Sequence, residues 1–146
     1  MNRWKLLLCI LPGLASAADI TIVLDPPLEA GTVFCEVYRT ANDFENFRAP
    51  LRVERFTLED AGPLVVRGVP AGELVGVVCL DENENGRLDR NFLGIPREPI
   101  AFSNDYRPRG PPVFFRARIR VAEGENQSVP LELRRTLGKR GRLGLG

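Results

Sequence analysis

The chain consists of short segments in which apolar residues recur at every second position, and no window has the 3.6-residue period of an amphipathic helix. The clearest segment is residues 113–121, with the sequence VFFRARIRV. Its odd-numbered positions are all apolar, whereas its even-numbered positions carry Phe114, Arg116, Arg118 and Arg120. The alternation predicts a strand with one apolar face toward a core and one basic face toward solvent.

Six further segments have the character of short strands, at residues 18–25, 32–39, 51–54, 63–67, 73–80 and 129–133. Most of them alternate, but residues 73–80 form an almost unbroken apolar run that is typical of a central strand. The 14 glycines and 12 prolines supply turns between the segments. We therefore predict an all-β fold, a single antiparallel β-sandwich of about seven strands that is immunoglobulin-like or transthyretin-like, with one long loop at residues 81–112.

The N-terminus has the organisation of a secretory signal peptide. Arg3 and Lys5 precede a short apolar run at residues 6–14, and the sequence Ala-Ser-Ala that ends at Ala17 suits signal peptidase. The apolar run is shorter than the roughly 20 residues of a membrane-spanning helix. We predict a signal peptide at residues 1–17, cleavage after Ala17 and a periplasmic or secreted protein; the alternative is a buried N-terminal helix.

The predicted mature chain comprises one β-sandwich domain, residues 18–135, and a glycine-rich basic tail, residues 136–146, that we expect to be disordered. Cleavage removes two of the 20 basic residues and leaves 18 against 19 acidic residues. A nearly neutral chain has no general attraction for nucleic acid or for an anionic membrane. No second apolar segment approaches spanning length, so we predict no transmembrane segment, and we expect a monomer.

Only Cys35 and Cys79 remain after the predicted cleavage, and each lies in a strand-like segment. Paired cysteines are common in exported proteins, so we predict a Cys35–Cys79 disulfide that joins two strands and contributes about 3–4 kcal/mol. The alternative is two separate buried thiols. A catalytic thiol is disfavoured because the chain contains no histidine to activate it.

The segment D-E-N-E-N-G-R-L-D at residues 81–89 places oxygen-bearing side chains at every second position around a glycine, which is the spacing of a Ca²⁺ loop. The predicted ligands are Asp81, Asn83, Asn85, the carbonyl of Arg87, Asp89 and, folded back by two prolines, Glu98. Phe92 stands where an EF-hand has its bidentate glutamate, so we expect weak binding, on the order of 10⁻⁴–10⁻³ M. Asparagine and aspartate also cap such turns without metal, and that alternative stays open. Zinc is disfavoured because histidine is absent.

Four pieces of the chain together resemble a bacterial secreted family, domain of unknown function 2141. These pieces are residues 81–89, the G-I-P-R-E-P sequence at 94–99, the F-S-N sequence at 102–104 and residues 112–117. The resemblance implies an exported, periplasmic β-sandwich similar to transthyretin-like or carboxypeptidase-regulatory-like modules. It does not imply an activity.

We therefore expect an exported, non-catalytic module that binds a protein or glycan partner through the 81–112 loop. Ca²⁺ bound in this loop would stabilise it. The binding residues would lie around a groove: Phe92, Phe102, Asn104 and Tyr106. The F-S-N sequence has a second interpretation, in which it hydrogen-bonds the loop backbone and holds it over the end of the sandwich.

Two alternative functions remain. One is a hydrolase that cleaves a polysaccharide with a carboxylate pair drawn from Asp81, Asp89 and Glu98. The other is a structural envelope protein that docks through an edge strand or through the arginines of residues 113–121.

Overall fold

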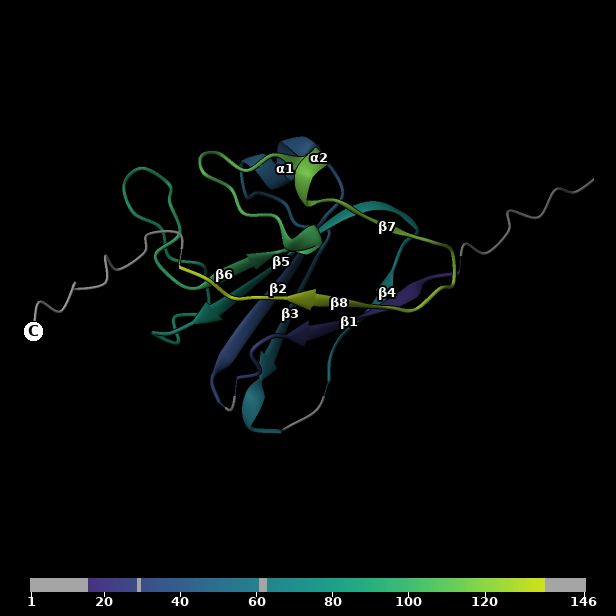
Figure 1. Cartoon of the computed structure of the whole chain (residues 1–146), viewed down its shortest axis with the longest axis horizontal. Helices are drawn as coiled ribbons and strands as arrows, with labels where there is room; N and C mark the ends of the chain where they lie inside the picture. Colours follow the sequence, from purple (N-terminus) through teal and green to yellow (C-terminus); the bar gives the residue numbers. More distant parts are fainter. Residues whose placement is uncertain (1–15, 29, 61–62, 136–146) are drawn as a thin grey trace, which may run out of the picture.

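A computed structural model of the protein describes residues 16–28, 30–60 and 63–135. The described residues form eight strands and two short α-helices (Figure 1). The strands are β1 (Ala18–Leu24), β2 (Thr32–Tyr38), β3 (Arg52–Thr57), β4 (Leu64–Val69), β5 (Gly72–Asp81), β6 (Ile100–Phe102), β7 (Ile119–Val121) and β8 (Gln127–Leu131). The helices are α1 (Ala41–Glu45) and α2 (Phe114–Ala117). Most of the predicted signal peptide, up to residue 15, and the predicted tail at 136–146 lie outside the described residues.

The strands form two sheets that pack against each other, so the predicted all-β sandwich is confirmed. One sheet has the order β4-β1-β8, and the other has the order β3-β2-β5-β6 with β7 paired to the start of β5. Pairing is antiparallel except between β1 and β8, which run parallel. The predicted central strand at residues 73–80 is β5, which lies between β2 and β6.

Alternate residues of the two sheets meet in the main core. Ile20 and Ile22 of β1, Val33 and Val37 of β2 and Val78 of β5 are all buried in one cluster between the sheets. Removing each such side chain from water contributes about 1.5–3 kcal/mol to folding. The period-2 pattern of these strands therefore gives the sandwich its interior.

A second apolar cluster covers the opposite face of the larger sheet. Val75 and Val77 of β5 and Tyr38 of β2 pack there with Phe44 of α1 and Phe114 of α2. Strand β5 is consequently buried on both faces, which explains its unbroken apolar sequence. The two helices and the loops beside them form a third layer outside the sandwich (Figure 1).

The prediction of one long strand at residues 113–121 is wrong. Residues Phe114–Ala117 form one helical turn, α2, and only Ile119–Val121 is a strand. Phe114 and Ala117, three residues apart, are buried in the second cluster, whereas Phe115 is 67% exposed. Burial of Phe114 overrides the local alternation, because a helical turn puts residues three apart on one face.

The predicted basic face of that strand is consequently wrong as well. Arg116 lies on α2, and Arg118 follows the helix, 3.1 Å from Glu73. The Arg118 guanidinium also lies 4.7 Å from the centre of the Phe115 ring. The arginines of this segment therefore do not form a stripe on one strand.

The predicted disulfide is also wrong, and both cysteines are free thiols. In the pairing of β2 with β5, Cys35 lies opposite Val78 and Phe34 lies opposite Cys79. The two cysteines therefore project from opposite faces of the sheet, since successive strand residues alternate. Burial raises the pKa of the Cys35 thiol to about 12. Burial, and then the nearby Glu98 carboxylate, also raise the pKa of Cys79.

These thiols should be inert in the native protein, because only the thiolate attacks disulfide reagents. We expect the form that begins at Ala18, purified without reductant, to react negligibly with 5,5′-dithiobis(2-nitrobenzoate) at pH 8. In concentrated guanidinium chloride both Cys35 and Cys79 should react at once, and Cys35→Ser should halve that signal. A denatured protein that reacts only after reduction would contradict the free thiols.

Candidate functional site

Carboxylate groups organise the long connection between β5 and β6. Asp81, the last residue of β5, is 3% exposed and accepts the backbone N–H groups of Asn85 at 3.2 Å and Gly86 at 2.9 Å. Gly86 has a φ of 81°, in the left-handed region that favours glycine. The D-x-N-x-N-G spacing thus allows one aspartate to close a turn onto N–H groups four and five residues later.

Asp89 binds the asparagine side chains of the same turn. Asn85 donates through Nδ2 at 2.9 Å and Asn83 through Nδ2 at 2.5 Å. These hydrogen bonds, that of Asn85 first, lower the pKa of the Asp89 carboxyl below its ordinary value. Arg87 lies 3.7 Å away in an exposed ion pair, which stabilises little.

Glu98 is a carboxylate buried under the loop, with 4% of the residue exposed. It accepts the N–H of Glu82 at 3.0 Å and the N–H of Asp89 at 3.0 Å. The Cys79 thiol lies 3.7 Å from Glu98 Oε2, the oxygen that also accepts the N–H of Asp89. Glu98, near the end of the connection, therefore joins its beginning at Glu82 and its middle at Asp89 to Cys79 of β5.

The six predicted metal-binding residues take part in this single hydrogen-bonded network. They are Asp81, Asn83, Asn85, Arg87, Asp89 and Glu98. Across residues 16–28, 30–60 and 63–135, no three His, Cys, Asp or Glu side chains gather closely enough to share a metal ion. Hydrogen bonds to N–H groups account for the order of the loop, and Ca²⁺ binding stays a prediction.

Replacing Glu98 should loosen the whole connection. We expect Glu98→Ala to lower the free energy of unfolding by about 2–3 kcal/mol. The substitution leaves two backbone N–H groups without an acceptor and creates a cavity where the side chain was. Urea unfolding of the form that begins at Ala18 measures the loss, and faster hydrogen exchange at Glu82 and Asp89 locates it. The control is Glu125→Ala in an exposed turn, with an expected change within about 0.5 kcal/mol. Equal losses in the two variants would contradict the role of Glu98.

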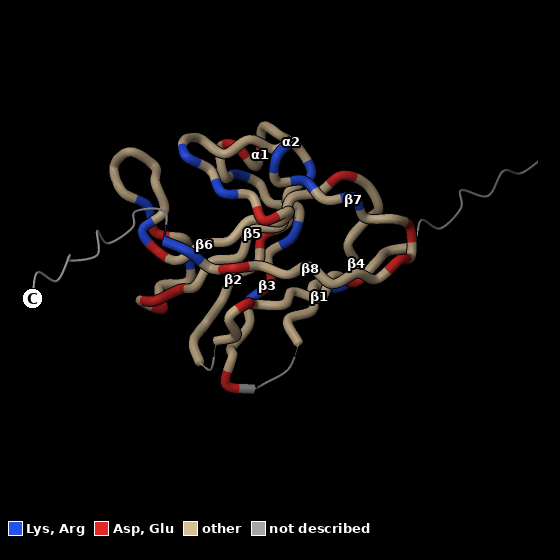
Figure 2. The backbone as a smooth tube through the Cα atoms, viewed as in Figure 1, with Lys and Arg blue, Asp and Glu red and all other residues tan. Residues whose placement is uncertain are grey.

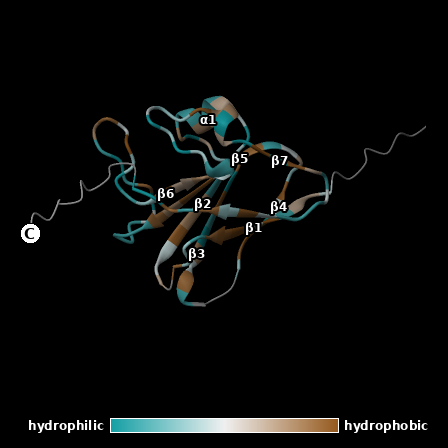
Figure 3. Cartoon of the chain, in the orientation of Figure 1, coloured by the Kyte–Doolittle hydropathy of each residue, from teal (hydrophilic) through white to brown (hydrophobic). Residues whose placement is uncertain are grey.

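Beyond this network the chain forms a hairpin at residues 89–97. Asp89 and Arg97 are joined by a backbone hydrogen bond of 2.9 Å, and the Asn91 side chain accepts the N–H groups of Leu93 at 2.9 Å and Ile95 at 3.0 Å. The hairpin holds an apolar tip in solvent, where Leu93 is 67% exposed (Figure 3). The neighbouring Phe92, which is 95% exposed, also belongs to this tip.

The segment after β6 is tied to β5 and to α2. Ser103 Oγ accepts the N–H of Gly76 at 3.0 Å and donates to the carbonyl of Ala117 at 2.5 Å. Asn104, with a φ of 60°, donates to the carbonyl of Arg116 at 2.9 Å. The polar side chains of the F-S-N sequence therefore tie α2 to β5 and to the end of the connection, and their partners are not backbone groups of the 81–112 loop.

A groove of about 550 Å³ lies between the 89–97 hairpin, the end of helix α1 and residues 108–112. Its apolar lining consists of Phe47, Leu93, Ile95, Pro96, Phe102, Pro108, Pro111 and Pro112. Its charged lining is Glu45, Arg90 and Arg109, and Figure 2 shows basic residues on both loops and around α1. The Arg90 guanidinium lies 4.2 Å from the centre of the Phe47 ring. A volume of roughly 300–1,000 Å³ with a mainly apolar lining is typical of a ligand site.

Helix α1 is fixed at the edge of this groove by its own caps and contacts. Thr40 Oγ1 accepts the N–H of Asp43 at 3.1 Å, which caps the first turn. Phe44 is completely buried and packs edge-on against Phe102, with ring centres 5.9 Å apart. Glu45 Oε1 accepts the N–H of Phe114 at 3.1 Å and so joins α1 to α2.

The predicted binding residues have different positions relative to the groove. Phe102 lines it, and Asn104 is used for the backbone hydrogen bond to Arg116. Tyr106 lines a separate, smaller cavity of about 150 Å³ and accepts the N–H of Val113 at 3.1 Å. Phe92 is 95% exposed at the hairpin tip and does not line the groove.

Sequence reasoning missed Phe47, Arg90 and Arg109. They come from three separate segments that only the tertiary structure brings together. The positive φ of Phe47, 47°, does not show in a sequence, and no local motif marks the two arginines. The one indication of these residues in the sequence was Arg90, which directly follows the Ca²⁺-like turn.

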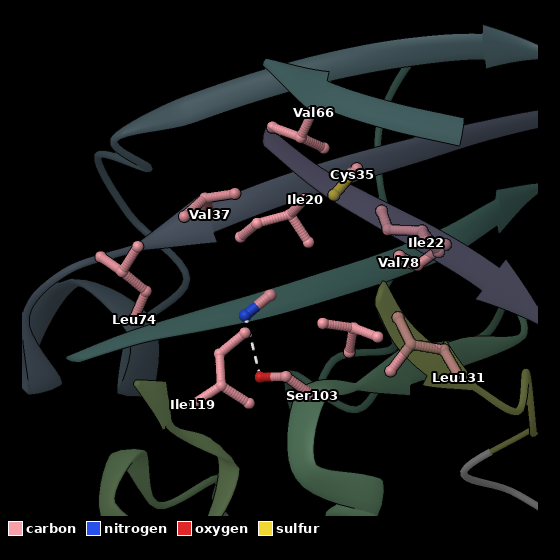
Figure 4. Close-up of a pocket in the computed structure, with 12 residues that line it drawn as sticks. Ile20, Ile22, Cys35, Val37, Val66, Leu74, Val78, Ser103, Ile119 and Leu131 are labelled. Carbon is pink, nitrogen blue, oxygen red and sulfur yellow. Dashed lines mark hydrogen bonds between the residues drawn. The ribbon is translucent and has the colours of Figure 1, made fainter. Parts of the chain in front are cut away.

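The interior of the sandwich offers no comparable site. The cavity between the sheets measures about 20 Å³, enough for one water molecule, and its lining is apolar apart from Ser103 (Figure 4). Ser103 turns its hydroxyl to the N–H of Gly76 (Figure 4). Since both hydrogen-bonding functions of Ser103 are used within the fold, the cavity has nothing to hold a polar ligand.

Fold and groove together define the protein as a β-sandwich module with a loop-framed surface groove. The chain belongs to the family described as an uncharacterized protein conserved in bacteria (DUF2141), which it matches over residues 26–129. This confirms the resemblance seen in the sequence. No curated protein and no solved structure matches the chain. Among the described helices, none is long and apolar enough to cross a membrane.

Proposed function

We propose that this protein is an exported, non-catalytic binding module whose ligand lies in the groove between the 89–97 hairpin, α1 and residues 108–112. The observation that carries the proposal is the groove, whose walls are fixed by hydrogen bonds within the protein. Glu98 and Asn91 fix the hairpin, Glu45 ties α1 to α2, and Ser103 holds α2 at Ala117. A site with walls fixed in advance loses less conformational entropy when a ligand binds.

Two features favour binding over the polysaccharide hydrolase. A general acid needs a raised pKa, whereas hydrogen bonds lower the pKa of Asp89. Asp81 and Glu98 are buried and accept backbone N–H groups, so their oxygens face the loop rather than the groove. The envelope-docking alternative loses its basic stripe, because Arg116 and Arg118 do not share a strand face.

Export is part of the proposal. It is supported by the small residues that end at Ala17 and by the start of β1 at Ala18. A sandwich that begins directly after the predicted cleavage site would lose no strand on maturation.

A neutral apolar dye tests the groove without assuming a natural ligand. We expect Nile red to bind the mature protein with increased fluorescence, and Leu93→Glu to weaken binding by about fivefold or more, because it puts a charge in the apolar lining. Phe92→Glu is the matched control: it adds the same charge one residue away, outside the lining. No binding to the wild type, or equal weakening by both variants, would argue against the groove.

Ca²⁺ is the second component of the proposed function. We propose that it binds the oxygens of the 81–89 turn, with Asp89 as the most accessible of the predicted carboxylate ligands, since Asp81 and Glu98 are buried. The ion must displace the Asn83 and Asn85 side chains from Asp89, which supports a weak affinity, on the order of 10⁻⁴–10⁻³ M.

Ca²⁺ at 10 mM should therefore stabilise the mature protein by about 1.4–2.7 kcal/mol relative to EDTA, a rise in Tm of several degrees. Asp89→Asn should abolish the rise, whereas Glu84→Gln, which removes the same charge from an exposed side chain of the same turn, should keep most of it. Differential scanning fluorimetry with Ca²⁺ and Mg²⁺ measures both. An unchanged Tm of the wild type in Ca²⁺ would leave the turn as a metal-free structure.

A further inference from the structure

We infer that the groove binds an amphiphilic anion, a carboxylate attached to an extended apolar chain. The inference rests on the proposed function and specifies its ligand. It depends on the charges at the groove, on its lining and on the access that its aromatic rings allow.

The groove has an excess of positive charge. No carboxylate of the described residues lies within ion-pair distance of Arg90 or Arg109. The single acidic residue of the lining, Glu45, already accepts the N–H of Phe114. An anion would therefore find two guanidinium groups that have no acidic partner of their own.

Both groups have the chemistry of carboxylate recognition. A guanidinium presents parallel N–H donors that match the two oxygens of a carboxylate. Stacking on Phe47 restrains the plane of the Arg90 guanidinium and leaves its edge free to donate. The described residues contain no lysine, so every basic side chain near the groove is of this kind.

The rest of the lining suits an apolar chain. Leu93 and Ile95 come from one wall, and Pro108, Pro111 and Pro112 come from the other. These side chains supply apolar surface without further hydrogen-bond donors. A ligand with one charged end and a long apolar body matches such a lining.

The same groove is poorly suited to a glycan. Sugars stack on exposed aromatic faces, but the Phe47 ring carries Arg90 and Phe102 is only 6% exposed. Asn46 is the single amide of the lining. An amphiphile therefore fits better than the glycan that the sequence led us to consider.

Isothermal titration with decanoate below its micellar concentration, at pH 7.5, tests the inference on the mature protein. Decanol and decyltrimethylammonium are the neutral and cationic controls of equal chain length. We expect decanoate to bind at least tenfold more tightly than either control. Arg90→Gln and Arg109→Gln should each reduce this preference severalfold, whereas Arg120→Gln, an exposed arginine on β7, should not.

Arg109 makes no hydrogen bond or ion pair among the described residues, so its loss should leave the fold intact, and an unchanged circular dichroism spectrum and an unchanged Tm check this. Equal binding of decanoate and decanol would overturn the inference while the groove remained a binding site. Displacement of Nile red by an acidic, leucine-containing peptide but not by decanoate would also overturn it, in favour of a protein partner. Absence of Nile red binding to the wild type would remove both the inference and the proposed function.

Discussion

Strand β5 is buried on both faces, and the rest of the structure depends on this. One face, with Leu74 and Val78, meets the smaller sheet, and the other, with Val75 and Val77, meets the helices. A strand buried twice fixes three layers relative to one another through one stretch of backbone. Its last residue, Asp81, is also the point at which the long connection to β6 begins.

The fold was predictable where local pattern and tertiary burial agree. The apolar run of β5 predicted a central strand correctly because both faces of the strand pack against apolar side chains. The strand predicted at residues 113–121 was wrong for the opposite reason. The sequence there does alternate, but Phe114 packs in a cluster with Phe44, which lies 70 positions away along the chain. The predicted disulfide was wrong because Cys35 and Cys79 point to opposite faces of the sheet. Their faces depend on the relative register of two strands, which a sequence does not give.

The candidate site divides in the same way. The turn from Asp81 to Asp89 was predictable because its partners are at most eight residues apart, and their spacing reflects the hydrogen bonds that they make. Glu98 was within reach because two prolines bring it back to the turn. The groove was not predictable, since Phe47, Arg90 and Arg109 are neighbours only after β2, β5 and β6 have assembled.

The hairpin and, through α2, helix α1 are tied to β5. On one side, Glu98 lies by Cys79 of β5 and holds the N–H of Asp89, and Arg90 follows directly. On the other side, the N–H of Gly76 in β5 holds Ser103, which in turn holds α2. Two of the three elements that frame the groove are therefore connected to a single buried strand. Substitutions at the hairpin tip should change the lining of the groove without disturbing the sandwich, because no side chain of the tip takes part in these hydrogen bonds.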